Sequence, residues 1–170
     1  MRIRHATPAD YDVVIRVLDD WWGGRQMADM LPRLFFVHFR DTSFVAEDNG
    51  DVVGFLVGFL SQTSDDEAYI HFAGVEPDHR GQGIARALYE RFFEAAAADG
   101  RAVIRCVTSP VNTESVAFHT HLGFAIQPGD TEIAGVDVHR SYDGPGEDRV
   151  VFARRLQLVA RKGTGKGEPA

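Results

Sequence analysis

The chain has 170 residues, of which 44% are hydrophobic and 25% are charged, and these values predict one globular domain with a core that needs no disulfides. Its net charge of −7 at pH 7 argues against nonspecific nucleic-acid binding, and its apolar runs are too short to span a membrane. A single cysteine, Cys106, fits a cytoplasmic protein. The chain starts without an apolar run, so we expect no signal peptide.

The first forty residues predict a strand, a helix and a less regular segment. Residues 2–5 alternate in polarity, which is typical of a strand. The Thr-Pro pair at residues 7–8 is typical of a helix start, and apolar residues then recur at helical spacing as far as Trp22. Gly23-Gly24 ends this helix. Residues 26–40 predict either a second short helix or a loop.

The next segment predicts a β-hairpin. Two apolar stretches, residues 43–47 and 52–60, flank the sequence Asp48-Asn49-Gly50-Asp51. An Asn-Gly pair tolerates the positive φ angles of a tight hairpin turn, so the two stretches are expected to pair as antiparallel strands. Gly54 and Gly58 in the second stretch predict a bulge or a close backbone neighbour.

A strand, a Gly-rich turn and a helix follow one another at the centre of the chain. Residues 67–75 predict a strand that extends the hairpin into a meander, and apolar residues spaced by four from Ile84 predict an amphipathic helix over residues 84–98. Gly81 and Gly83 let the backbone pass close to a ligand. Because the first N–H groups of a helix lack partners within it and lie at the positive end of its dipole, this joint predicts a phosphate site.

The second half of the chain predicts one more strand–helix–strand succession. Residues 102–107 are mostly apolar and predict a buried strand, which should pair in parallel with the strand before the helix through a right-handed crossover. Asn112 is a good N-cap for a helix over residues 113–121. Residues 127–146 predict an irregular loop with room for a short helix, and residues 148–158 predict the last strand.

Two segments resemble the conserved blocks of the GNAT superfamily of acyl-CoA-dependent N-acetyltransferases. The first block reads Arg80-x-x-Gly83-x-Ala85 and follows Val75-x-Pro77 at the end of a strand. The second block reads from Asn112 to Gly123-Phe124, with Ser115 at its small position, Phe118 at its apolar position and His119 where the family usually has tyrosine. Together they span residues 69–124, about a third of the chain.

The resemblance implies an α/β fold of the mixed α+β kind, with a twisted mixed sheet of about seven strands and helices on both faces. It implies a GNAT domain over residues 1–160, and residues 161–170, rich in Gly and Lys, are expected to form a disordered tail. It also implies direct transfer of an acetyl or other short acyl group from acetyl-CoA to a primary amine on a small molecule or peptide. Two alternatives stay open: a CoA-binding module that no longer catalyses, and an acetyltransferase for protein N-termini or lysines. The family often dimerises, so a homodimer is also compatible with the resemblance.

The resemblance assigns the CoA site to the end of the strand, the Gly-rich turn and the second block. The pantetheine arm is expected beside Gly74 and Val75, and the Val75 N–H is the expected donor to the thioester oxygen. The cofactor-binding residues expected on this basis are Gly74, Val75, Arg80, Gly81, Gln82, Gly83, Ile84, Ala85, Asn112 and Ser115. Arg80 has an alternative role as a solvated turn residue.

His119 is the candidate acid. Asn112, Ser115 and His119 are spaced i, i+3 and i+7 and therefore lie on one helix face, whereas His121 points away from it. The family's tyrosine often donates a proton to the departing thiolate, and an imidazolium at the same position is a stronger acid than a phenol. The alternative is a histidine that only satisfies a helix C-terminus.

The strand over residues 67–75 supplies the candidate base. Strict alternation places Tyr69, His71, Ala73 and Val75 on one face and Ile70, Phe72 and Gly74 on the other. Many relatives carry a glutamate on this strand, and its register falls near Tyr69, a poor base at neutral pH. His71 is the better candidate, although it could equally hold a neighbouring carbonyl. Glu67, Asp137 and His139 are held in reserve.

The acceptor is expected between residues 21–30 and 130–147. Trp21, Arg25 and Gln26 are the candidate substrate contacts by resemblance, whereas Trp22 continues the apolar helix face and is assigned to the core. No metal site is expected, because the chain has no His-Glu-x-x-His sequence and no cysteine pair.

Overall fold

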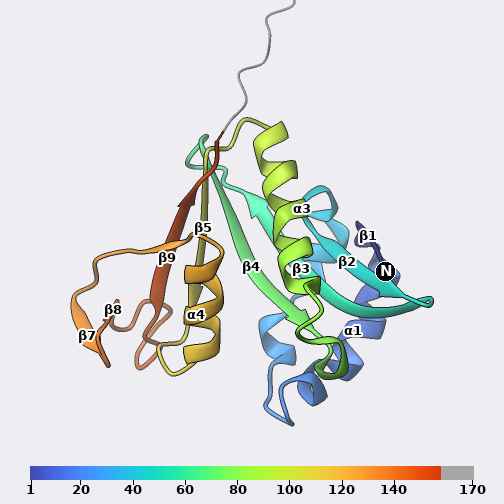
Figure 1. The fold of residues 1–170 in the computed structure, drawn as a ribbon, viewed down its shortest axis with the longest axis horizontal. Helices are drawn as coiled ribbons and strands as arrows, with labels where there is room; N and C mark the ends of the chain where they lie inside the picture. Colours follow the sequence, from blue (N-terminus) through green and yellow to red (C-terminus); the bar gives the residue numbers. More distant parts are fainter. Residues whose placement is uncertain (158–170) are drawn as a thin grey trace, which may run out of the picture.

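A seven-stranded sheet forms the centre of the molecule. The computed structural model describes residues 1–157, in which the strand order is β1-β2-β3-β4-β5-β9-β6 and every neighbouring pair is antiparallel except β4/β5 (Figure 1). The strands are β1 (Arg2–His5), β2 (Phe44–Asp48), β3 (Asp51–Leu60), β4 (Glu67–Val75), β5 (Val103–Thr108), β6 (Ala125–Ile126) and β9 (Val150–Arg155). The expected mixed sheet of about seven strands is confirmed.

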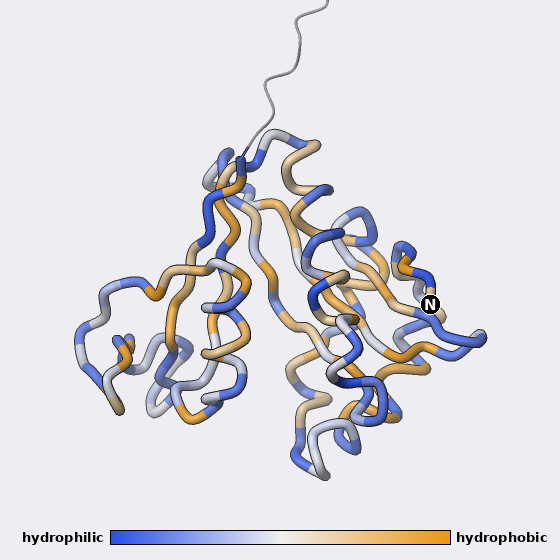
Figure 2. Tube along the Cα trace, in the orientation of Figure 1, coloured by the Kyte–Doolittle hydropathy of each residue, from blue (hydrophilic) through white to orange (hydrophobic). Residues whose placement is uncertain are grey.

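Helices cover both faces of the sheet, as expected. α3 (Ile84–Ala98) and α4 (Thr113–His121) pack on one face, and α1 (Pro8–Trp21) and α2 (Leu34–Val37) pack on the other (Figure 1). Each face buries its own apolar core, and Figure 2 shows the hydrophobic residues running along the central strands between the two helix layers. The sheet is therefore apolar on both sides, which is why its inner strands read as nearly continuous hydrophobic runs.

The predicted start of α1 is confirmed and is tied to the first strand. The Asp10 carboxylate accepts hydrogen bonds from the Thr7 N–H at 2.7 Å and from the Thr7 hydroxyl at 2.8 Å. Arg4 on β1 donates to both oxygens of the same carboxylate at 2.8 Å. Burial alone would raise the pKa of Asp10, but the hydrogen bonds from Arg4 and Thr7 outweigh it and lower the pKa.

The predicted hairpin joins β2 to β3. Asn49 and Gly50 have φ angles of 50° and 95°, as a tight turn of this sequence requires. The register between β3 and β4 shifts at Gly58, which confirms that a glycine in this strand marks an irregularity.

That shift corrects the expected faces of β4. Val57 lies opposite Phe72 and Gly58 opposite Ile70, so His71 is an extra, unpaired residue and β4 carries a β-bulge there. The bulge reverses the alternation: Tyr69 and His71 share the face of α1 and α2 with Phe72 and Gly74, whereas Ala68, Ile70, Ala73 and Val75 face α3. The expectation that His71 and Val75 share a face was wrong, because simple alternation does not allow for an inserted residue.

β4 and β5 are parallel, as predicted, but they pair over only three residues. Glu67, Ala68 and Tyr69 lie opposite Val103, Ile104 and Arg105, and beyond this point the two strands diverge, as Figure 1 shows. β4 continues to Val75 and β5 to Thr108 on opposite sides of the opening. The backbone edges that the strands would otherwise share are therefore freed in the middle of the sheet.

Two segments contain more elements than predicted. Residues 26–40, expected as a short helix or a loop, form a 3₁₀ turn at Ala28–Met30, the four-residue α2 and a second 3₁₀ turn at Arg40–Thr42. The expected loop over residues 127–146 contains a small hairpin of β7 (Thr131–Ile133) and β8 (Val136–Val138). Both stretches are short and rich in turn residues, so their periodicity is too weak to reveal them.

The last strand, predicted over residues 148–158, is β9 at Val150–Arg155. The expected tail over residues 161–170 lies outside the described residues. In the part of the chain that the structure describes, none of the helices has the length and apolar character needed to cross a bilayer.

Candidate active site

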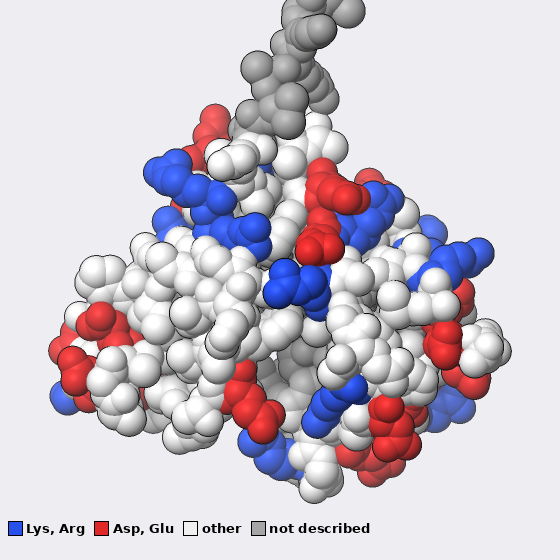
Figure 3. All heavy atoms as spheres, viewed as in Figure 1, with Lys and Arg blue, Asp and Glu red and all other residues white. Residues whose placement is uncertain are grey.

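Two cavities meet where β4 and β5 diverge. One, of about 760 Å³, lies between α4, the β4–α3 turn and the end of α1, and we call it the α3–α4 cavity. The other, of about 470 Å³, is bordered by β4, β5 and residues from Asp143 to Arg149, and we call it the loop cavity. Figure 3 shows the face of α3 and α4 hollowed between the two halves of the molecule. The residues that line both cavities are Trp22, Arg25, Ala73, Tyr89, Val111, Asn112, Ser115 and His119.

The predicted CoA residues fall into two groups. Those that line the α3–α4 cavity are Gly74, Val75, Arg80, Ala85, Asn112 and Ser115. Gly81, Gln82 and Gly83 are exposed at the turn, and the Ile84 side chain is buried in the core. These four residues therefore do not form the cavity wall themselves.

The turn before α3 is fixed by protein contacts. Arg80 donates to the carbonyl oxygen of Val75 at 3.1 Å and to that of Trp21 at 2.5 Å, so it joins the ends of β4 and α1. Gly83, with a φ of 82°, is the N-cap of α3 and has no side chain to cap it. The first N–H groups of α3 are thus free of side-chain caps among the described residues, as an anion site requires.

Gly74 is required by a close approach from α1. A Cβ atom at this position would lie 2.4 Å from Cη2 of Trp22, so the indole ring rests directly on the β4 backbone. Trp22 borders both cavities, whereas Trp21 is 5% exposed and stacks on Phe55 in the core. Trp22 packs against the core as expected but also borders both cavities, and Trp21, the expected acceptor contact, is buried yet borders the α3–α4 cavity.

The other two candidate acceptor contacts, Arg25 and Gln26, differ in whether they border a cavity. Arg25 lines both cavities and is exposed, whereas Gln26 is exposed but lies outside both sets of lining residues. The two side chains follow the Gly23-Gly24 turn, whose backbone has positive φ angles at both residues. A turn of this kind leaves the directions of the next side chains unreadable from sequence spacing.

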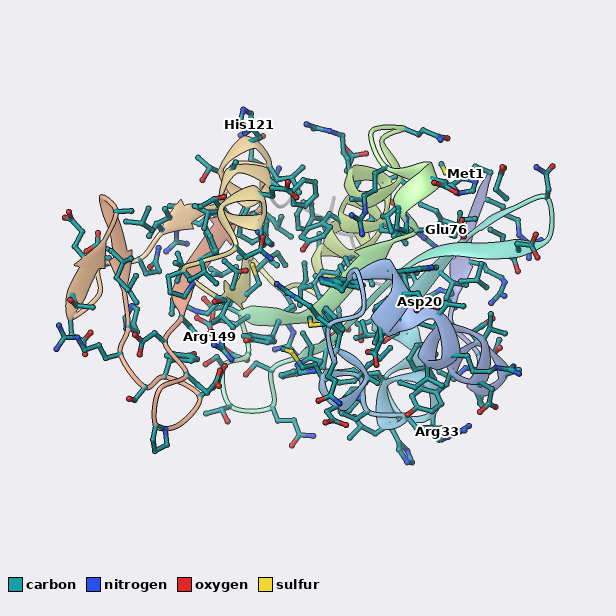
Figure 4. The ribbon with its side chains drawn as sticks, turned by 90° about the horizontal axis from the view of Figure 1, so that it is seen from below. Met1, Asp20, Arg33, Glu76, His121 and Arg149 are labelled. Atoms are coloured by element: carbon teal, nitrogen blue, oxygen red, sulfur yellow. The ribbon has the colours of Figure 1, made fainter. Side chains whose placement is uncertain are left out.

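The second block forms the predicted helix and its predicted face. The Asn112 side-chain oxygen accepts a hydrogen bond from the Ser115 N–H at 3.1 Å and caps α4 at the expected position. Asn112, Ser115 and His119 all line both cavities, which confirms that they share one face. His121 is exposed and points away from the molecule, as Figure 4 shows.

His119 is buried and both of its ring nitrogens have partners. Nδ1 lies 2.7 Å from the carbonyl oxygen of Ser115, which only accepts, so Nδ1 carries the hydrogen. Nε2 therefore presents a lone pair to the Tyr89 hydroxyl, which lies 3.0 Å away and donates to it. Burial lowers the pKa of His119, and the hydrogen bond to Ser115 offsets this only in part.

This geometry corrects the expected acid. An imidazolium that protonates the sulfur directly would need a free N–H directed into the cavity, and neither nitrogen of His119 offers one. Burial also favours the uncharged ring. The hydroxyl next to His119 Nε2 belongs to Tyr89, a residue of α3 that also lines both cavities and that sequence analysis missed.

His71 lines the loop cavity and is held by a backbone carbonyl. Its Nε2 lies 2.8 Å from the carbonyl oxygen of Met30, so Nε2 carries the hydrogen and Nδ1 the lone pair. Its ring stacks on Phe35 with 4.7 Å between the ring centroids. His71 thus makes the carbonyl contact that was its alternative role. This contact leaves Nδ1 able to accept a proton.

Tyr69 also lines the loop cavity, but as a neutral phenol. Burial raises its pKa well above the ordinary value, and its ring stacks on Phe59. Of the reserve residues, Glu67 is paired with Arg105 at 2.7 Å, and Asp137 and His139 lie outside both sets of lining residues.

A charged cluster closes one side of the loop cavity. Arg149 donates to Asp143 at 2.6 Å, to Glu147 at 2.9 Å and to the backbone oxygen of Asp148 at 2.9 Å. Figure 4 places Arg149 on the side of β9 and Asp20 on the side of α1. The cluster lies in the segment expected to form an acceptor wall, but no sequence motif marks its three side chains.

Among residues 1–157, no three His, Cys, Asp or Glu side chains gather where they could hold a metal ion.

Comparisons with known proteins agree with this geometry. Residues 11–124 match the family model described as acetyltransferase (GNAT) family. An L-2,4-diaminobutyric acid acetyltransferase from Nocardia farcinica is 34% identical over 79 residues, which cover 46% of this chain and 41% of that protein. The match thus spans less than half the length of that relative.

Two solved structures share the fold. Ard1 from Thermoplasma volcanium superposes with a TM-score of 0.73 and 22% identity, over 92% of this chain and 97% of that one. The diaminobutyrate acetyltransferase EctA from Paenibacillus lautus, solved with L-2,4-diaminobutyric acid and coenzyme A, superposes with a TM-score of 0.67 and 23% identity, over 95% and 98% of the two chains.

The buried His119 predicts a specific loss of stability in acid. Its pKa is lowered in the folded state, so below the ordinary value of 6.5 the unfolded chain binds a proton that the folded chain does not. The free energy of unfolding should therefore fall as the pH drops from 6.5 towards the folded pKa, by at most about 1.4 kcal/mol per pH unit. Denaturant titrations of the wild type and of His119→Gln between pH 5 and 8 would measure it. A wild-type curve parallel to that of the variant would contradict this prediction.

Proposed function

The chain belongs to the acetyltransferase (GNAT) family, and from this premise we propose that it transfers an acetyl or other short acyl group from acyl-CoA to a primary amine. The attack is direct, without a covalent enzyme intermediate. The observation that carries the proposal is the meeting of two cavities at the diverging ends of β4 and β5. One cavity offers a helix N-terminus to an anion, and the other offers a histidine lone pair to an amine.

The CoA moiety would occupy the α3–α4 cavity. Its diphosphate would accept hydrogen bonds from the uncapped N–H groups at the start of α3, where the helix dipole is positive. Its pantetheine arm would run along the freed edge of β4 beside Gly74 and Val75, in the manner of an added strand. Arg80 and Ala85 border this path.

The Val75 amide is the proposed donor to the thioester oxygen. The next N–H along the chain, that of Glu76, donates to the carbonyl oxygen of Val53 on β3. Because successive N–H groups of an extended chain point to opposite edges, the Val75 N–H points to the edge that faces the opening. A preformed amide at this place would stabilise the negative charge that develops on the carbonyl oxygen during attack.

The acceptor amine would occupy the loop cavity. The Asp143 and Glu147 carboxylates at its wall offer oxygens to an ammonium group, and Arg149 and Arg25 balance their charge. His71 would take a proton from that ammonium at Nδ1, because the Met30 carbonyl fixes the hydrogen on Nε2. The neutral amine would then attack the thioester carbon where the two cavities meet.

A small amino-acid amine is the preferred acceptor class. The loop cavity measures about 470 Å³, within the range of small-molecule sites. The Nocardia farcinica relative carries L-2,4-diaminobutyric acid in its name, which supports a small acceptor of this kind. The alternative acceptor is a protein N-terminus or a lysine side chain. An assay with peptide acceptors distinguishes the two classes.

The proposed function predicts amine-dependent release of free thiol from acetyl-CoA. The wild-type protein would be assayed with a chromogenic thiol reagent in the presence of L-2,4-diaminobutyric acid, a peptide with a free α-amine and an N-terminally blocked lysine peptide. At least one amine should raise the rate well above the amine-free rate. Binding of CoA without thiol release for any amine would identify a binding module instead.

A substitution at the start of α3 should weaken CoA binding. In Gly83→Asp the new carboxylate would accept from the same N–H groups and repel the diphosphate, raising the Kd for CoA by about tenfold or more. Gly100→Asp is the matched control, since Gly100 ends the same helix with a φ of 81° and, like Gly83, has no atom within 4 Å of an added Cβ. Calorimetric titration with CoA would compare them. Equal losses in both variants would argue against a diphosphate at this helix end.

Removal of the proposed base should slow turnover. His71→Ala is expected to lower kcat by about 10²-fold, because the ammonium then loses its proton only to water. Added imidazole should restore part of the rate by filling the space beside Phe35. His121→Ala, on the exposed side of α4, is the control and should keep the wild-type rate. Wild-type turnover by His71→Ala would remove this role.

A further inference from the structure

A tyrosine and a histidine from different helices form a buried pair at the junction of the two cavities. Tyr89 on α3 is 4% exposed and His119 on α4 is 5% exposed, and their polar atoms lie 3.0 Å apart. Both residues line both cavities. Neither expected motif predicts the contact, and neither side chain takes part in the proton removal by His71 or in the binding of the diphosphate.

The hydrogens in this pair have a defined order. The Ser115 carbonyl holds the hydrogen on His119 Nδ1, so Nε2 can only accept and the Tyr89 hydroxyl must donate to it. The Tyr89 oxygen keeps lone pairs that can accept a second hydrogen from a group in the cavity. Hydrogen-bond donation therefore runs in one direction, from a group in the cavity to Tyr89 and from Tyr89 to His119.

The surroundings of the pair disfavour a lone charge. The His119 ring stacks on Phe152 at 4.8 Å, and the rings of Phe118 and Phe124 stand edge-on to both members of the pair. Burial raises the pKa of Tyr89 and lowers that of His119, so both are neutral at rest. Because His119 Nε2 accepts the Tyr89 hydrogen, a proton that enters at the tyrosine oxygen is matched by one that leaves it for the histidine, and burial makes the resulting imidazolium short-lived.

We propose that Tyr89 and His119 carry the second proton of the reaction from the attacking nitrogen to the departing sulfur, an inference that rests on the proposed acetyl transfer. Attack by the neutral amine forms the C–N bond and gives an intermediate with a positive nitrogen and an oxyanion. The nitrogen gives its remaining extra proton to the Tyr89 oxygen while Tyr89 passes its own proton to His119 Nε2. The C–S bond then breaks with its electron pair going to sulfur, and the carbonyl reforms.

The relay then returns to its starting state. The imidazolium of His119 gives its Nε2 proton back to Tyr89, and Tyr89 protonates the thiolate. One hydroxyl can serve both atoms, because the nitrogen and the sulfur are bonded to the same carbon of the intermediate. The net change is one proton moved from nitrogen to sulfur, in addition to the proton that His71 removed from the ammonium. Tyr89 is therefore the catalytic residue, and His119 is a positioning residue that acts through it.

Two variants separate this role from a structural one. Tyr89→Phe removes the hydroxyl, whereas His119→Gln keeps an amide oxygen that can accept from Tyr89 but cannot hold the proton. Single-turnover consumption of acetyl-CoA would be measured with the best amine of the panel, together with the Kd for CoA. We expect both variants to lose about 10²-fold in rate with the Kd for CoA within twofold of the wild type.

The double variant and a control complete the experiment. When two residues act as a unit, replacing both lowers the rate no further than replacing one. Tyr89→Phe/His119→Gln should therefore be as slow as either single variant. Tyr11→Phe, at a partly buried tyrosine of α1 outside both cavities, should keep the wild-type rate. Single variants within twofold of the wild type, or losses that multiply in the double variant, would overturn the relay alone. A wild type that releases no thiol with any amine would overturn the proposed function and the relay with it.

Discussion

The rest of the structure depends on the short length over which β4 and β5 are hydrogen-bonded. Their backbones pair over three residues from Glu67 and then part, although both strands continue. A parallel pair buried between two helix layers would normally satisfy its N–H and C=O groups along its whole length. Here the freed edges border a space that α3, α4 and Trp22 enclose from one side and the loop before β9 from the other. Strand divergence thus creates polar backbone groups and cavity volume at the same place in the fold.

The tautomers of two histidines next to this opening are fixed in the same way. A backbone carbonyl holds one N–H of each ring: Met30 for His71 and Ser115 for His119. The opposite nitrogen is left with a lone pair, at Nδ1 in His71 and at Nε2 in His119. The two rings nevertheless differ in surroundings, because His71 lines only the loop cavity whereas His119 lies in an aromatic enclosure beside Tyr89. Their tautomers suit them to different protons of the proposed acetyl transfer.

The sequence predicts features that depend on neighbouring residues, and misses those that depend on contacts between distant ones. The Asn112 cap and the Asn49-Gly50 turn follow from local chemistry, and so does the strand–turn–helix joint that ends at α3. The bulge at His71 could not be read, because an inserted residue is defined only by the register of the neighbouring strand. The same holds for Tyr89, whose partner His119 lies 30 residues away on another helix. The family was thus easier to infer from the sequence than the side chains that meet at its cavities.

The position of Trp22 has an optical consequence. The chain has two tryptophans, and they lie in opposite environments: Trp21 is enclosed against Phe55, and Trp22 rests on the β4 backbone at the border of both cavities. Indole emission responds to the polarity and the quenching groups around the excited ring. A molecule that enters the loop cavity changes the surroundings of Trp22 and leaves those of Trp21 as they were, whereas a molecule in the α3–α4 cavity borders both rings. The fold therefore carries its own fluorescent indicator of occupancy of the loop cavity, together with an internal reference.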